Sequence, residues 1–287
     1  MPSVVTKEET SPHIVGGNDI ARPRFDRLSY SGKLEKYSYN DVTPVIGREF
    51  EGLQVTDLLQ ADDDTVRDLA VTVSQRGVVF LRDQDVTPTQ MKDLMQRLTK
   101  LAGSVRTPAQ FGPDAVENGK LTPGQPESSG LHVHPLTEEG SELGDQISVI
   151  SSEKQKKGGG LTHQLSDVSR FASAGWHSDI TFEPVPSDYA MLKIHTLPPT
   201  GGDTLWASGY EIYDRLSPPM REMLKGLTAT HDAKFFLDEA ERLGNPIRQE
   251  KRGSPLNHGT ALQAVHPVIR TNRMSLHPLH HPCRDVD

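Results

Sequence analysis

The chain is organised around the stretch GWHSDITF at residues 175–182, which is followed by TGGDTLW at residues 200–206. Side chains two positions apart on a strand point to the same face, so we expect His177 and Asp179 to project together and Ser178 to face away. An imidazole beside a carboxylate forms part of the 2-His-1-carboxylate triad, which binds Fe(II) and leaves coordination positions open. The spacing therefore predicts part of an iron site whose remaining ligand lies elsewhere in the chain.

The composition indicates a soluble globular protein. The chain has 287 residues and a formal net charge of −8, which fits one large domain or two small ones. The acidic balance argues against nucleic acid as a partner, because phosphate recognition needs clustered Lys and Arg. The single cysteine, Cys283, cannot form an intramolecular disulfide, and we see neither an apolar run that could span a bilayer nor a leader sequence. We therefore expect a cytoplasmic protein without membrane contact.

The N-terminal half carries the clearest helix signals. Residues 1–22 are polar and lack periodicity, so we expect a disordered arm. Residues 62–65 supply N-cap groups for a helix that ends at Gly77 and leads into a buried strand at residues 78–81. Residues 87–90 combine a capping box with a first-turn proline, which predicts a second helix.

Further along, short apolar runs alternate with Gly and Pro turns. We expect strands at residues 146–151 and 191–196, and a turn at residues 198–202 that leads into another strand through Trp206. A third helix is capped at residues 217–219, and its Met and Leu side chains are expected to point inward. The lysine- and glycine-rich residues 153–161 predict a solvated loop or, alternatively, a mobile cover over the site. Strands of this kind behind helices favour an α+β fold with a barrel or jelly roll flanked by helices.

Two histidine patterns are ambiguous by themselves. His177 and Asp179 form a His-x-Asp triplet, and roughly one such triplet is expected by chance in a chain of this composition. His132 and His134 would share one face of a strand, where a polar surface or a substrate contact is commoner than metal ligation. The neighbouring sequence has to decide what either pattern means.

Three motifs in the same order resemble the TauD/TfdA family of Fe(II)- and 2-oxoglutarate-dependent dioxygenases, especially the fungal type of its taurine or sulfonate branch. The motifs are GVVFLRDQ at residues 77–84, WHSDITF at residues 176–182 and GGDTLWAS at residues 201–208. The resemblance runs from about residue 37 through residue 271 and implies a double-stranded β-helix, a jelly roll, with flanking helices. Residues 23–271 are then the dioxygenase domain.

The resemblance also implies roles for individual residues. His177 and Asp179 would bind Fe(II), Thr204 would hydrogen-bond a carboxylate of 2-oxoglutarate, and His134 and Ile180 would contact the substrate. The implied reaction consumes O2 and 2-oxoglutarate, yields succinate and CO2, and oxidises a small anionic substrate, taurine-like, to an aldehyde with release of sulfite. A charge-assisted bond from the His134 imidazole to the sulfonate is physically reasonable.

Two positions depart from the taurine pattern, since Thr137 stands where the family usually has tyrosine and Ser173 where it usually has asparagine. Taurine itself therefore stays open as the substrate, and so does a homo-oligomeric state.

The end of the chain departs from the resemblance. HPVIRT at residues 266–271 still matches, but residues 272–287 do not, and the family's second histidine ligand and its arginine for 2-oxoglutarate lie downstream of that segment. We therefore expect a truncated domain with an aberrant tail and little or no activity. Three tail histidines are unfavourable replacement ligands, because prolines break the segment that carries His277, His280 and His281.

Two alternatives to the dioxygenase remain. One is a non-catalytic binding protein on the same fold, and the other is a hydrolase or isomerase that uses another metal. The sequence around Thr204 weakens the second alternative.

Overall fold

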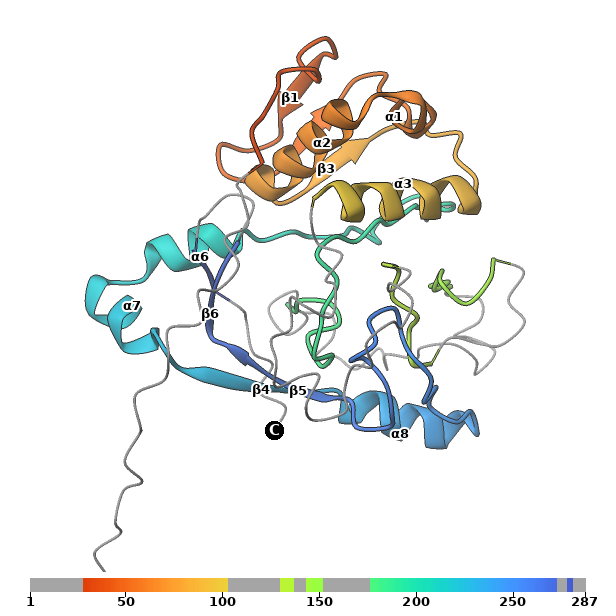
Figure 1. The fold of residues 1–287 in the computed structure, drawn as a ribbon, viewed down its shortest axis with the longest axis vertical. Coiled ribbons are helices and arrows are strands. Elements are labelled where there is room, and N and C mark those ends of the chain that lie inside the picture. Colours follow the sequence, from red (N-terminus) through yellow and green to blue (C-terminus); the bar gives the residue numbers. More distant parts are fainter. Residues whose placement is uncertain (1–27, 103–129, 137–142, 152–175, 273–277, 281–287) are drawn as a thin grey trace, which may run out of the picture.

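The computed structural model describes residues 28–102, 130–136, 143–151, 176–272 and 278–280 (Figure 1). The predicted arm at residues 1–22 and the loop at residues 153–161 lie outside these described residues. The described part combines helices with short strands, which confirms the α+β class.

A three-stranded sheet with helices beside it forms the N-terminal part (Figure 1). The strands are β1 (Tyr39–Asp41), β2 (Arg48–Phe50) and β3 (Val79–Leu81), in the order β1-β2-β3. β1 and β2 are antiparallel, whereas β2 and β3 are parallel. The parallel pair needs a crossover connection, which α1 (Val55–Gln60) and α2 (Asp63–Arg76) supply.

The caps predicted for α2 and α3 (Pro88–Leu101) are confirmed. The Asp62 carboxylate accepts a hydrogen bond from the Thr65 amide at the start of α2, and Gly77 ends that helix with φ of 72°. Only glycine adopts such a backbone at low cost. At the start of α3, the side chains of Thr87 and Gln90 bond each other's backbone amides.

The apolar faces of these helices pack on the sheet. β3 is half-buried, which is less than the sequence predicted. Burying a large aliphatic or aromatic side chain contributes about 1.5–3 kcal/mol, so this cluster is the main source of stability in the N-terminal part. Its fully enclosed members include Leu34, Phe50, Leu53, Leu58, Val66 and Leu94.

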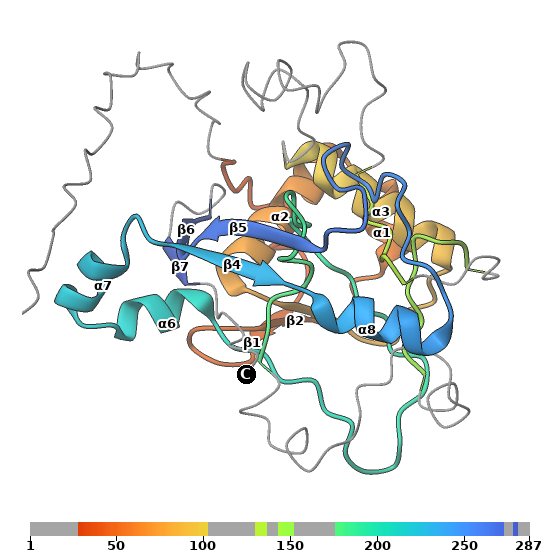
Figure 2. The ribbon, with the colours of Figure 1, turned by 90° about the horizontal axis from the view of Figure 1, so that it is seen from below.

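The C-terminal part contains three helices and four strands within the described residues. β4 and β5 are antiparallel, with His231 opposite Ala264, and β6 and β7 form a second antiparallel pair. Figure 2 shows β4 and β5 side by side and β4 leading into α8. The elements are α6 (Gly209–Arg215), α7 (Pro218–Leu224), β4 (Thr228–Asp232), α8 (Lys234–Leu243), β5 (Gln263–Pro267), β6 (Ile269–Thr271) and β7 (Pro278–His280).

A second, smaller core lies where α8 meets the turn that follows Asp179. Sequence analysis did not predict α8, although Phe236 and Ala240 recur on one face and Gly244 ends the helix in the left-handed conformation. The core consists of Phe182, Ala233, Ala240, Ile247 and Leu262, with Leu136, Ile180 and Phe236 packed against it.

Several predicted strands are wrong. Residues 146–151, 191–196 and the run that ends at Trp206 have irregular backbone. Residues 131–134, for which a strand was one possibility, are irregular as well. Leu192 and Leu197 are 56% and 61% exposed, so this segment lacks a covering layer within the described part of the chain. Alternation produces a strand only where a neighbouring strand takes up the backbone hydrogen bonds.

Two predictions about buried side chains are also wrong. Met220 and Met223 on α7 are exposed rather than inward-facing. Trp176 and Trp206 would pack inside the jelly roll that the sequence resemblance implies, but they are 39% and 46% exposed. The reason is the same, because the described residues place no layer over these side chains.

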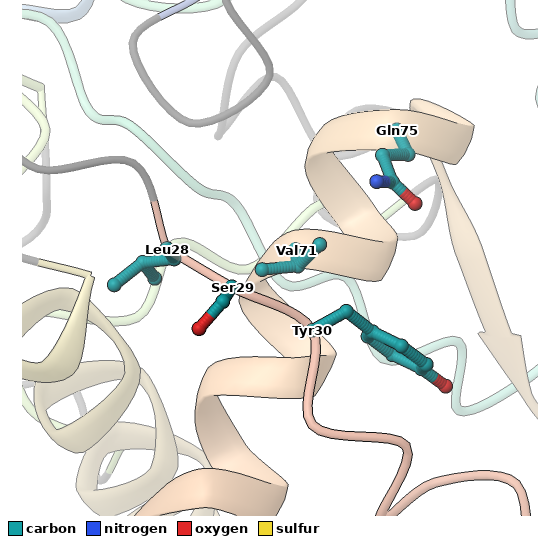
Figure 3. A pocket seen from close by; sticks show the side chains of 5 residues that line it. All are labelled: Leu28, Ser29, Tyr30, Val71 and Gln75. Carbon is teal, nitrogen blue, oxygen red and sulfur yellow. The ribbon is translucent and has the colours of Figure 1, made fainter.

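A cavity of about 300 Å³ lies between the start of the described chain and α2 (Figure 3). Leu28, Ser29 and Tyr30 line it from one side, and Val71 and Gln75 of α2 from the other. None of these residues belongs to the site predicted from the sequence. Of the helices that the structure describes, none is long and apolar enough to cross a bilayer.

Candidate metal and substrate site

His177 and Asp179 lie side by side, but on a turn rather than on a strand. Residues 176–178 have irregular backbone and residues 179–182 form the turn. The Nε2 atom of His177 is 3.2 Å from Oδ1 of Asp179. The spacing therefore brings the imidazole and the carboxylate together as expected, while the local structure that does so differs from the expected one.

The electrostatics of this pair suit a cation. The hydrogen bond from His177 lowers the pKa of the Asp179 carboxyl below its ordinary value, so that the carboxylate is ionised at neutral pH. The side chains of His177 and Asp179 are 56% and 69% exposed. An imidazole nitrogen and a carboxylate oxygen are ligand types that Fe(II) accepts, so the donor set fits this metal in kind.

The turn after Asp179 is strained. Ile180 has φ of 57°, which is unfavourable for a β-branched residue. A hydrogen bond of 3.1 Å from the Glu183 amide to the Ile180 carbonyl closes the turn. Phe182 is buried against Phe236 of α8, with ring centroids 5.5 Å apart. Such strain costs of order 1–3 kcal/mol and persists only where the surroundings over-determine it.

His134 is held near this turn as a neutral hydrogen-bond donor. Its Nδ1 accepts a 3.1 Å hydrogen bond from the Leu136 amide. A backbone N–H can only donate, so the proton of the neutral ring is on Nε2. Burial, together with the nearby His132, lowers the pKa of His134 to about 4. The charge-assisted bond that the sequence suggested is therefore replaced by an uncharged N–H donor at neutral pH.

Phe236 contacts both the segment that carries His134 and the turn that follows Asp179. Its ring is perpendicular to that of His134 at 4.7 Å between centroids, and it also contacts Phe182. The charge of Asp179 raises the pKa of His134, which opposes the effect of burial and shows that the two groups sense each other. The signal that could have found Phe236 is the apolar period of α8.

Thr204 is separate from this group. It is exposed on the irregular segment of residues 200–207. No hydrogen bond or ion pair that the structure describes joins Thr204 to His177 or Asp179.

A third metal ligand is not found within the described residues, where no three His, Cys, Asp or Glu side chains form a cluster suited to a metal. The tail residues His277 and His281, and the side chain of His280, lie outside the described part. Thr137 and Ser173 lie outside it as well.

His231, on β4, is buried with its ring 5.4 Å from that of His266 on β5. His231 therefore contributes to packing between β4 and β5.

Comparison with known proteins gives a consistent family. The model of "Taurine catabolism dioxygenase TauD, TfdA family" matches residues 38–284. The chain is similar to the alpha-ketoglutarate-dependent dioxygenase esdpJ of Penicillium shearii, at 34% identity over 280 residues, covering 85% of this chain and 69% of that protein. It is similar to btcD of Neocamarosporium betae, a dioxygenase of the same description, at 39% identity over 257 residues, covering 85% and 68%.

Two further similarities are lower in sequence identity. An alpha-ketoglutarate-dependent sulfonate dioxygenase of Saccharomyces cerevisiae is 29% identical over 258 residues, covering 86% of this chain and 50% of that protein. A solved taurine dioxygenase from Burkholderia xenovorans has a TM-score of 0.45 and 21% identity, covering 85% and 62%. This chain thus spans between half and about two thirds of the length of these proteins.

The family model covers most of the chain, and two fungal relatives exceed 30% identity over 85% of it. This chain therefore belongs to the TauD/TfdA family and is, by homology, a 2-oxoglutarate-dependent dioxygenase.

Proposed function

We propose that His177 and Asp179 are two of the Fe(II) ligands of a dioxygenase that acts on a small organic anion, a sulfonate in the first instance. The observation that carries the proposal is the 3.2 Å pair of imidazole and ionised carboxylate on a hydrogen-bonded turn near His134. We further infer that residues 23–271 form this domain as a double-stranded β-helix. The family match over residues 38–284 supports a dioxygenase domain across most of this range and continues beyond residue 271.

Each group of the chain has a distinct task in this proposal. His177 and Asp179 hold the metal, which when bound supplies the oxidation of substrate by O2, coupled to conversion of 2-oxoglutarate into succinate and CO2. Thr204 binds a carboxylate of 2-oxoglutarate through its hydroxyl. Ile180 and the ring of Phe236 present apolar surface that orients the substrate carbon and excludes water.

The protonation state of His134 determines which hydrogen-bonding group the substrate must carry. A neutral imidazole with its proton on Nε2 donates one hydrogen bond to an oxygen acceptor. Sulfonate, sulfate-ester and carboxylate oxygens all accept such a bond, so His134 selects for an oxygen acceptor at this position. The name of the yeast relative favours sulfonate among them.

The test measures metal binding and turnover separately on the full chain. Co(II) binding is titrated spectroscopically, and succinate release is measured with Fe(II), 2-oxoglutarate and O2 in the presence of taurine, an alkanesulfonate or a carboxylate of the same length. We expect Co(II) binding that His177→Ala abolishes and that His195→Ala, a change at an exposed histidine elsewhere, leaves intact. Absence of metal binding in the unaltered chain would contradict the proposal and favour the non-catalytic protein.

Turnover tests a further expectation. We predict low succinate release from the 287-residue chain, because the described residues contain no third His, Cys, Asp or Glu that forms a metal cluster with His177 and Asp179. The succinate assay with Fe(II), 2-oxoglutarate and O2 measures this rate. Succinate release by this chain at ordinary enzymatic rates would contradict it.

A further inference from the structure

Glu183 and Arg252 form a buried ion pair four residues after Asp179. Their relative exposures are 0% and 1%. The guanidinium donates to both carboxylate oxygens, from Nε to Oε1 at 2.5 Å and from Nη2 to Oε2 at 3.0 Å. The remaining nitrogen, Nη1, donates to the carbonyls of Arg248 at 2.8 Å and Gly259 at 2.9 Å. All three nitrogens of the Arg252 guanidinium therefore donate hydrogen bonds, which fixes the orientation of the group.

Glu183 has a third partner. Nε2 of His132 lies 3.0 Å from Oε1 of Glu183, and His132 is two residues before His134. Burial alone would raise the pKa of Glu183, but the hydrogen bonds from His132 and Arg252 outweigh it and lower that pKa. One carboxylate thus joins the turn that bears Asp179, the segment that bears His134 and the loop that contains Arg252.

The backbone of the same turn is held by two further side chains. Asn257 accepts a bond from the Val185 amide at 3.0 Å and donates to the Val185 carbonyl at 2.8 Å. Nε2 of His266 lies 2.9 Å from the Thr181 carbonyl and 3.0 Å from that of Glu183. The strained turn is therefore held by contacts from residues far along the chain.

We propose that Arg252 is a positioning residue, which acts through Glu183 to fix the turn carrying Asp179 relative to the segment carrying His134. This inference rests on the proposed function, since it sets where the substrate donor stands relative to the metal ligand. A buried ion pair is weak support for stability, because replacing both partners by apolar groups is often neutral. We therefore attribute the buried ion pair to the positioning of these two segments rather than to stability.

The first test compares two arginines that each form a bidentate contact with a glutamate. Arg252→Lys keeps the charge but loses the two-pronged contact, and Arg242→Lys is the matched control. Within α8, Arg242 donates to both carboxylate oxygens of Glu239, from Nε at 2.9 Å and from Nη2 at 2.6 Å, and its own side chain is 44% exposed whereas Glu239 is buried. We expect Arg252→Lys to weaken Co(II) binding about tenfold or more and to speed amide exchange in residues 180–185, while Arg242→Lys changes neither. Wild-type Co(II) affinity in Arg252→Lys overturns the proposal.

A second variant separates position from stability. The double change Glu183→Gln with Arg252→Met removes both charges, so it avoids leaving one of them buried and unpaired. We expect the thermal midpoint to recover relative to Arg252→Met alone, while Co(II) affinity stays reduced. Recovery of both together assigns the pair a structural role only and overturns the proposal.

Amide exchange keeps this test distinct from that of the proposed function. If the unaltered chain binds no Co(II), the proposed function fails, and exchange alone then decides the role of Arg252. Faster exchange in both residues 131–136 and residues 180–185 of Arg252→Lys, relative to Arg242→Lys, supports the positioning role of Arg252. Unchanged exchange in either segment overturns it.

Discussion

The ring of Phe236 on α8 lies perpendicular to the ring of His134, with 4.7 Å between their centroids. This contact, with the hydrogen bond from the Leu136 amide, orients the imidazole so that its Nε2–H is the free donor of the ring to a ligand. Helix α8, which we did not predict from the sequence, therefore sets the direction of the proposed substrate contact.

Removing that ring is expected to change the protonation of His134. Burial is the largest cause of its lowered pKa, so Phe236→Ala admits water and moves the pKa from about 4 towards its ordinary value near 6.5. NMR titration of the His134 Cε1–H resonance measures the shift. Phe235→Ala is the control on the same helix, because Phe235 is 38% exposed. An equal shift in both variants would contradict this role of Phe236.

His134 also predicts how stability depends on pH. Its pKa is lower in the folded protein, about 4, than in the unfolded chain, near 6.5. The unfolded state therefore binds the proton first, and folding stability falls as the pH drops from about 6.5 to about 4, by about 2–3 kcal/mol in total. Urea unfolding across this range should show a shallower loss in His134→Gln than in His195→Gln. Equal slopes in the two variants would refute the assignment.

Asp179→Asn tests the charge without altering the shape. The side chain is exposed, so we expect no measurable change in the thermal midpoint. The carboxylate is the anionic member of the proposed metal pair, and its loss is expected to weaken Co(II) binding by a hundredfold or more. Asp238→Asn on the surface of α8 is the control, since Asp238 pairs only with Lys234 at 2.6 Å among the contacts described. Equal Co(II) affinity in both variants would remove Asp179 from the metal site.

Local signals in the sequence predicted local structure well. The caps at Asp62 and Thr87 depend on side chains within three residues, and both helices begin where those caps place them. The strands predicted at residues 191–196 and in the run that ends at Trp206 have irregular backbone, because a strand also requires a partner that no local pattern contains.

In the candidate site, too, the contacts between residues close in sequence were predictable and the contacts between distant residues were not. His177 and Asp179 are two residues apart, so almost any extended or turn backbone keeps them close, and their proximity was predictable although the strand was not. Glu183 and Arg252 are 69 positions apart, and nothing in either neighbourhood indicates their pairing. The side chains that hold the site in place are therefore those that sequence reasoning could not find.

The strain at Ile180 gives the last prediction. With φ of 57°, any residue that has a Cβ retains the unfavourable backbone, whereas glycine adopts it at little cost. Ile180→Ala loses packing against the second core and keeps the strain, while Ile180→Gly loses the same packing and relieves about 1–2 kcal/mol. We expect the glycine variant to be the more stable of the two, which is the reverse of the usual order. Urea unfolding of both variants measures the difference, and Val185→Ala against Val185→Gly provides the ordinary order for comparison. If alanine is the more stable substitution at both positions, the turn is not strained, and Ile180 acts through its side-chain contacts alone.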